Sequence, residues 1–143
     1  VIHRDSKPPN RRGVDPGVVK ILDCGIAKAM DVRGVSATGV ACGTPLYMSP
    51  EQIRGSRVLD PRTDLYSLGC VMFALFTGSV PFAGDEVFEL LMAHMNQPPP
   101  RPRDIRADLP RALDGIILRL LSKDPDDRYA SCAELAQAMD SVP

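Results

Sequence analysis

The chain has 143 residues, of which 44% are hydrophobic and 24% charged, values that exclude a disordered chain and suit one globular domain with a single core. Its 17 basic and 18 acidic residues leave a formal charge of −1, so no excess of positive charge marks a surface for nucleic acid or an anionic membrane. The longest apolar run, Leu65 to Phe76, is shorter than the roughly 20 residues that span a bilayer. We therefore predict that this segment contacts neither nucleic acid nor a membrane.

The chain begins at Val1 without an initiator methionine or a signal peptide, which indicates a truncated start. The four cysteines have neither a close pair nor metal-ligand spacing, so they are expected to be free thiols in a reducing compartment. They are Cys24, Cys42, Cys70 and Cys132. We predict a cytoplasmic location, either for the whole protein or for the cytoplasmic part of a longer, membrane-anchored one.

The N-terminal third is predicted to consist mainly of loops. Residues 1–17 are polar and contain several prolines and glycines, which predicts a long loop. A β-branched run, Val18 to Leu22, predicts a short strand that brings Asp23 to a turn at Gly25. No hydrophobic period holds from Ala27 to Ser49, and an irregular segment of that length is usually functional.

The rest of the chain predicts helices. Leu65 to Phe76 is apolar nearly all round, so we expect a core helix that is buried on every side. A second helix is predicted from about Glu86 to Met95, and we interpret His94 within it as structural. The proline loop that follows, Gln97 to Pro102, could be an extended ligand for an aromatic groove, but we favour a stiff surface connector.

Two further helices complete the prediction. One has Pro110 in its first turn and directs an apolar stripe toward the core. The stripe consists of Leu113, Ile116, Ile117, Leu120 and Leu121. Ser131 and Glu134 then form a capping-box pattern ahead of a last helix that carries Leu135 and Met139. The predicted fold class is therefore mainly α.

Polar residues near the N-terminus combine the groups that phosphoryl transfer needs. That reaction requires a carboxylate to accept the hydroxyl proton, a cation near the moving phosphoryl group, and hard oxygen ligands for magnesium. The segment His3-Arg4-Asp5-Ser6-Lys7-Pro8-Pro9-Asn10, with Asp23 after the predicted strand, supplies all three. This segment resembles the catalytic loop of eukaryotic-type serine/threonine protein kinases, His-Arg-Asp-x-Lys-x-x-Asn, at every fixed position.

The resemblance continues in order along the chain. Gly43 to Glu51 resembles the end of an activation segment, with Ser49 in place of the usual alanine, and Asp64 to Gly69 resembles the start of the central helix. Gly78 to Phe82 resembles the loop that leaves that helix, and Asp124 to Arg128 resembles a turn with a buried arginine. The motifs are typical of bacterial members. They imply a protein kinase-like fold, represented by its helical C-terminal lobe with the catalytic loop and activation segment, and without the N-terminal β lobe.

The resemblance divides this partial kinase domain, residues 1–143, into catalytic and metal-binding loops (1–25), an activation segment (26–51) and a helical subdomain (52–143). It implies transfer of the γ-phosphoryl group of ATP to serine or threonine hydroxyls of protein substrates, with Mg²⁺ as the metal.

The resemblance also assigns roles to individual residues. Asp5 would accept the proton of the substrate hydroxyl, and Lys7 would contact ATP and stabilise the transferring phosphoryl group. Asn10, as part of the catalytic loop, and Asp23 would hold magnesium and the nucleotide phosphates. Thr44 would line the catalytic site that receives the acceptor residue.

Other residues would regulate or support this site. Arg4 would neutralise a phosphate on the activation segment, for which Ser36 and Thr38 are candidates, although both could be ordinary loop hydroxyls. Cys42 could be a redox switch, but an exposed thiol is favoured. The residues with structural roles would be Glu51, Asp64 and Arg128, with a buried ion pair between the first and the last.

Two positions depart from the family pattern. Cys24 stands where the family has a phenylalanine, and Arg11-Arg12-Gly13 stands where a short apolar strand follows the catalytic loop. The second departure resembles a small deletion, and we expect it to remove the strand partner of Val18 to Leu22. The helix that precedes the catalytic loop in the family is not among these residues, so we expect part of the face of Leu65 to Phe76 to be exposed.

The family's glycine-rich loop, strand lysine and adenine-binding hinge are likewise not among these residues. Phosphoryl transfer depends on positioning, so we predict little or no activity for this chain by itself. One alternative is a non-catalytic, pseudokinase-like module that binds proteins through its helices. Another is the product of a truncated gene.

Overall fold

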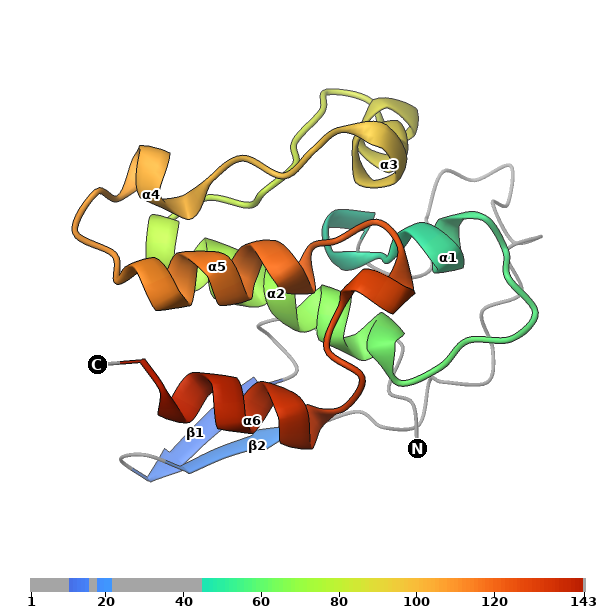
Figure 1. Ribbon diagram of the computed structural model, residues 1–143. Coiled ribbons are helices and arrows are strands. Elements are labelled where there is room, and N and C mark those ends of the chain that lie inside the picture. The colour runs from blue at the N-terminus through green and yellow to red at the C-terminus, as the bar shows by residue number, and fades with distance from the viewer. Residues whose placement is uncertain (1–10, 16–17, 22–44, 143) are drawn as a thin grey trace.

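The computed structural model describes residues 11–15, 18–21 and 45–142. This part of the chain contains two short strands followed by helices, so the predicted mainly α fold is confirmed (Figure 1). The strands are β1 (Arg11–Asp15) and β2 (Val18–Ile21). The helices are the short η4 (Pro45–Tyr47) and η5 (Pro125–Asp127), and α1 (Pro50–Ile53), α2 (Arg62–Thr77), α3 (Val87–Asn96), α4 (Pro102–Ile105), α5 (Arg111–Leu120) and α6 (Cys132–Asp140).

The two strands form an antiparallel pair, with Arg11 opposite Ile21 and an irregularity between Gly13 and Asp15. The expectation of a loop over residues 1–17 was therefore wrong at 11–15. The expected loss of the strand partner of β2 was also wrong. Strand pairing uses backbone N–H and C=O groups, so a polar segment pairs as well as an apolar one when a short connection brings it alongside.

The central helix α2 is longer than predicted at both ends. Asp60 accepts a hydrogen bond from the backbone N–H of Arg62 at 2.7 Å and so extends the helix at its start. Gly78, with φ of 82°, ends it in the left-handed conformation that a glycine tolerates best. The side chain of Leu75 is 71% exposed, so the prediction that this helix is buried on every side is wrong at this position. The expectation that part of the helix face is exposed is met there.

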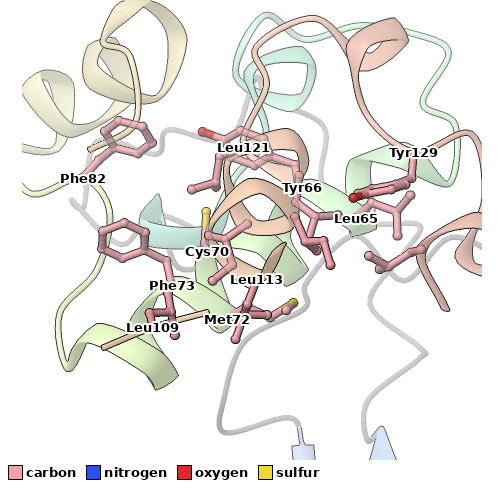
Figure 2. Packing of buried hydrophobic residues seen from close by; sticks show 14 of the residues in the cluster. Leu65, Tyr66, Cys70, Met72, Phe73, Phe82, Leu109, Leu113, Leu121 and Tyr129 are labelled. Atoms are coloured by element: carbon pink, nitrogen blue, oxygen red, sulfur yellow. The ribbon is translucent and has the colours of Figure 1, made fainter. Parts of the chain in front are cut away.

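The core forms where α5 packs against α2 (Figure 2). The apolar stripe predicted for α5 is buried at all its positions: Leu113, Ile116, Ile117, Leu120 and Leu121. Gly69 of α2 permits the close approach, because a Cβ atom at this position would lie 2.8 Å from the Cβ atom of Leu120. Pro110 lies just before the first turn of α5 rather than within it.

The proline-rich segment connects α3 to α4. Its last proline, Pro102, is buried at the start of α4, so the loop predicted to run through Pro102 ends one residue earlier. An extended ligand for an aromatic groove needs its prolines accessible. Pro102 is not accessible for such a contact, but Pro98 and Pro100 are exposed, so the stiff connector stays a prediction.

The last helix begins as the capping pattern predicts, with one difference. The Ser131 hydroxyl accepts a hydrogen bond from the backbone N–H of Glu134 at 3.2 Å. The Glu134 carboxylate accepts from the backbone N–H of Ala130 at 2.7 Å. Leu135 is buried in the core, whereas Met139 is exposed.

Candidate active site

The residues predicted to carry catalysis, metal binding and regulation lie outside the described residues. They are Arg4, Asp5, Lys7, Asn10, Asp23, Ser36, Thr38 and Thr44. The predicted turn at Gly25 and the cysteines Cys24 and Cys42 lie outside them as well. What the structure describes is the pair of strands β1 and β2, which lie between Asn10 and Asp23 in the sequence, and the framework that follows Thr44.

The framework begins with a helix start that the sequence motifs did not identify. The Ser49 hydroxyl accepts a hydrogen bond from the backbone N–H of Gln52 at 3.3 Å, and the Gln52 side chain accepts from the backbone N–H of Ser49 at 3.0 Å. Pro50 occupies the first helical position, where its missing N–H costs nothing. This capping box, Ser49-Pro50-Glu51-Gln52, starts α1 and directs Glu51 into the interior.

Glu51 and Arg128 form the buried ion pair that the sequence predicts. The carboxylate oxygens Oε1 and Oε2 of Glu51 lie 2.7 and 2.9 Å from the two terminal nitrogens of Arg128. Thr63 donates a further hydrogen bond to Oε1 at 2.8 Å. Burial opposes ionisation of Glu51, but the hydrogen bonds and the charge of Arg128 outweigh it and hold the pKa of the carboxyl below its ordinary value.

The remaining N–H groups of Arg128 are also satisfied. Nε donates to the carbonyl of Ser122 at 2.8 Å, and the terminal nitrogens donate to the carbonyls of Arg62 at 3.0 Å and Lys123 at 3.2 Å. The guanidinium group lies over the ring of Tyr66, with its central carbon 4.9 Å from the ring centroid. The side chain of Arg128 is fully buried, and a charge can be stable there only because every donor has a partner.

Helix α2 also holds the turn η4, which directly follows Thr44. The Ser67 hydroxyl donates to the backbone carbonyl of Tyr47 at 2.7 Å. The backbone N–H of Met48 donates to the carbonyl of Pro45 at 3.3 Å and closes the turn. Asp64, predicted to be structural, lies in the first turn of the same helix. Residues of η4 therefore depend on α2 for their position.

The family model for the protein kinase domain matches residues 1–140 of this chain. The chain belongs to the protein kinase domain family. Over 137 residues it is 43% identical to serine/threonine-protein kinase PknB of Mycolicibacterium smegmatis, an alignment that covers 94% of this chain and 22% of the relative. Two kinases of Myxococcus xanthus are similar to it as well. Pkn1 is 43% identical over 144 residues, 97% of this chain and 21% of Pkn1.

The second Myxococcus xanthus relative, pkn3, is 43% identical over 152 residues, which cover 99% of this chain and 28% of that protein. The kinase domain segment therefore spans between 21% and 28% of the length of these curated relatives. All three relatives are named serine/threonine-protein kinases, so the predicted bacterial serine/threonine kinase family is confirmed.

Within its described residues, the kinase domain shows no cluster of histidine, cysteine, aspartate or glutamate that could hold a metal ion. The predicted magnesium ligands, Asn10 and Asp23, lie outside this part. None of the described helices is both long enough and apolar enough to cross a membrane.

One buried polar cluster of the kinase domain was not identified from the sequence. The Tyr66 hydroxyl lies 2.9 Å from Nδ1 of His94, which is fully buried on α3. The pattern of α3 places His94 one turn after the buried Leu90, on the face toward the core. That signal was available, but only the tertiary contact shows what the ring binds.

Proposed function

We propose that the protein transfers the γ-phosphoryl group of ATP to serine or threonine hydroxyls of proteins, with Mg²⁺ as the metal. Membership of the protein kinase domain family and the names of the relatives support this activity. The structural observation that best supports this activity is the register of the β1–β2 pair, in which Arg11 lies opposite Ile21.

That register has a consequence for the metal ligands. Asn10 comes immediately before β1, and Asp23 follows β2 after one intervening residue. Because Arg11 and Ile21 pair, the chain enters and leaves the hairpin at the same end. An amide and a carboxylate there would both be available to one hard cation, which prefers oxygen ligands. Magnesium bound to them would neutralise charge on the phosphates of ATP.

The other proposed roles are those that the resemblance to the catalytic loop and activation segment implies. Asp5 orients the acceptor hydroxyl and takes up its proton, and Lys7 places a positive charge beside the transferring phosphoryl group. Thr44 lines the acceptor site, and the described anchoring of the adjacent η4 by Ser67 supports this assignment. Arg4 pairs with a phosphate at Ser36 or Thr38 when residues 26–51 are in their active arrangement.

The proposed partner is a protein that presents a serine or threonine side chain, and the proposed location is the cytoplasm. The reaction needs ATP and protein acceptors, both of which that compartment supplies.

The test is transfer of labelled γ-phosphate from ATP to a generic protein acceptor by the natural full-length protein that carries this sequence. Asp5→Asn is expected to lower kcat by about 100-fold or more, because it removes the proton acceptor and keeps the side-chain shape. Asp140→Asn is the matched control, because Asp140 is an exposed residue at the end of α6. Wild-type turnover in Asp5→Asn would contradict the proposed role of Asp5, and no transfer by the wild-type protein would contradict the proposed activity.

The chain of 143 residues by itself is expected to show little or no turnover, because it contains no glycine-rich phosphate loop or strand lysine. If this chain alone turned over at the rate typical of kinases, about 1 to 100 per second, that expectation would be wrong.

A further inference from the structure

The strongest unexplained feature of the described residues is the environment of His94. Its ring is fully buried between α2 and the segment that follows it. The ring of Phe82 approaches it edge-on at 4.9 Å between centroids, and the Tyr66 hydroxyl lies 2.9 Å from Nδ1. The other ring nitrogen, Nε2, has no hydrogen-bond partner among the described residues. A buried polar atom without a partner is costly, so this arrangement needs a reason.

The protonation of the ring follows from its surroundings. Burial and the nearby ammonium group of Lys123 lower the pKa of His94, whereas the interaction of the ring with the backbone of Leu46 raises it. The first two effects are larger, so the ring is neutral. Burial also keeps the Tyr66 phenol protonated, because it raises the pKa of that group. We assign the Tyr66 hydroxyl as the donor and Nδ1 as the acceptor, which places the ring proton on Nε2.

Lys123 fixes the end of α3 that carries this histidine. Its Nζ donates to the backbone carbonyls of His94 at 2.7 Å and Ala93 at 3.3 Å. The same ammonium group lies 4.0 Å from the centroid of the Phe82 ring. A cation at the last carbonyls of a helix is favourable, because these carry the negative end of the helix dipole. The backbone and the ring of His94 are thus held independently.

The contacts of Tyr66 and its neighbour link this site to η4. The Arg128 guanidinium group lies over the ring of Tyr66, and the hydroxyl of the adjacent Ser67 donates a hydrogen bond to the backbone carbonyl of Tyr47. Helix α3 contacts both η4 and α1, and α2 contacts η4 as well. Displacement of α3 or rotation of Tyr66 would therefore disturb the turn that directly follows Thr44.

We propose that His94 is a positioning residue for the acceptor protein: by accepting the Tyr66 hydroxyl it ties α3 to α2 and holds η4 in place. The ligand whose binding depends on this tie is the polypeptide on either side of the acceptor hydroxyl, and not ATP. The proposal has two halves. The functional half, that acceptor binding depends on His94, rests on the proposed phosphoryl transfer. The structural half, that His94 holds η4, does not depend on it.

The test compares variants of the natural full-length protein. His94→Phe keeps an aromatic ring and removes the acceptor, which leaves the Tyr66 hydroxyl buried without a partner. His94→Asn keeps an oxygen near the position of Nδ1, and Tyr66→Phe combined with His94→Phe removes the orphaned hydroxyl. Glu89→Gln, an exposed change on the same helix, is the control.

The first readout is amide hydrogen exchange in a peptide covering residues 45–53, which includes the Met48 amide that closes η4. We expect faster exchange in His94→Phe and partial recovery in His94→Asn. The double variant, which still lacks the hydrogen bond between α3 and α2, should exchange as fast as His94→Phe, and Glu89→Gln should not change the rate. Exchange at the wild-type rate in His94→Phe would overturn the structural half. This readout needs no enzymatic activity.

The second readout separates the two substrates. In His94→Phe, the KM for an acceptor peptide is expected to rise about three- to tenfold, while the KM for ATP stays within about twofold. An equal rise in both KM values, or an effect of His94→Phe that simply adds to that of Tyr66→Phe, would show a merely structural role and overturn the functional half. If the wild-type protein transfers no phosphoryl group, the proposed function fails together with the functional half, and hydrogen exchange alone decides whether His94 holds η4.

Discussion

The guanidinium group of Arg128 and the carboxylate of Glu51 are 77 positions apart in the chain and meet in a two-point ion pair from which solvent is almost excluded. The pair joins α1, directly after η4, to the turn that follows α5. Tyr66 and Thr63 of α2 complete its surroundings. One interaction thus ties the segment after Thr44 to the C-terminal half of the core.

Loss of one partner of this ion pair is expected to be costly. Arg128→Met leaves the Glu51 carboxylate buried without its main partner, and we expect the free energy of unfolding to fall by about 3 to 5 kcal/mol. Urea unfolding followed by circular dichroism measures the change. Arg62→Gln is the control, because its ion pair with the exposed Asp126 lies at the surface and is expected to contribute less than about 1 kcal/mol.

The double variant Glu51→Gln with Arg128→Met tests the reason for that cost. If the penalty comes from an uncompensated buried charge, the double variant should be more stable than Arg128→Met alone. A double variant that loses the sum of the two single effects would show that the charges act independently.

The contact between α2 and α5 predicts a loss of stability on substitution of one glycine and no loss on substitution of another. Gly69→Ala places a Cβ atom 2.8 Å from the Cβ atom of Leu120 and 3.3 Å from the backbone carbon of Leu120, so the helices must separate. We expect a loss of about 1 to 3 kcal/mol in stability. Thermal unfolding provides the measurement.

Gly115→Ala is the matched control, since Gly115 also lies within a helix and a Cβ atom there meets nothing within 4 Å. Its expected effect is a gain of up to about 1 kcal/mol from helix propensity. Equal destabilisation by both changes would mean that the close approach of α2 and α5 at Gly69 does not limit stability.

His94 predicts a dependence of stability on acid. Burial and the charge of Lys123 lower the pKa of His94 from 6.5 to about 4 in the folded protein, whereas the unfolded chain keeps the ordinary value. Between these values the unfolded state binds more protons than the folded state, so stability falls as the pH drops from about 6.5 to about 4. The full contribution, present above the unfolded pKa, is about 3 kcal/mol at most.

Other groups titrate in the same range, so the informative quantity is a difference between proteins. The free energy of unfolding is measured from pH 7 to pH 4 for wild type and His94→Phe. We expect the wild type to lose more stability than the variant over this interval. Parallel curves for the two proteins would mean that the folded state binds a proton on His94 as readily as the unfolded state.

The two described cysteines are expected to differ in reactivity. Cys70 is fully buried, and burial raises the pKa of its thiol, so little thiolate forms and no reagent reaches it. Cys132 is exposed at the start of α6. In a protein with Cys24→Ser and Cys42→Ser, a disulfide reagent should modify Cys132 under native conditions and Cys70 only after unfolding.

The control for this labelling is the further change Cys132→Ser, which should abolish reaction of the folded protein. Rapid modification of Cys70 in that variant would indicate that the core around α2 opens far more often than its burial implies.

The amino-acid sequence by itself determined the mainly α fold, the position of the main helices and the membership of the kinase family. The stripe from Leu113 to Leu121 was predictable because helix periodicity is a local property of the chain. The pairing of Glu51 with Arg128 was predictable only through a family motif, since nothing local joins residues so far apart.

Only the tertiary structure decided the remaining features. The polar segment Arg11–Asp15 pairs with β2 because backbone groups, rather than side chains, make the ladder. The exposure of Leu75, the close approach at Gly69 and the contact of His94 with Tyr66 each depend on which surfaces meet when helices pack. Local propensity contains no information about these tertiary contacts, because packing is decided by distant parts of the chain that compete for the same core.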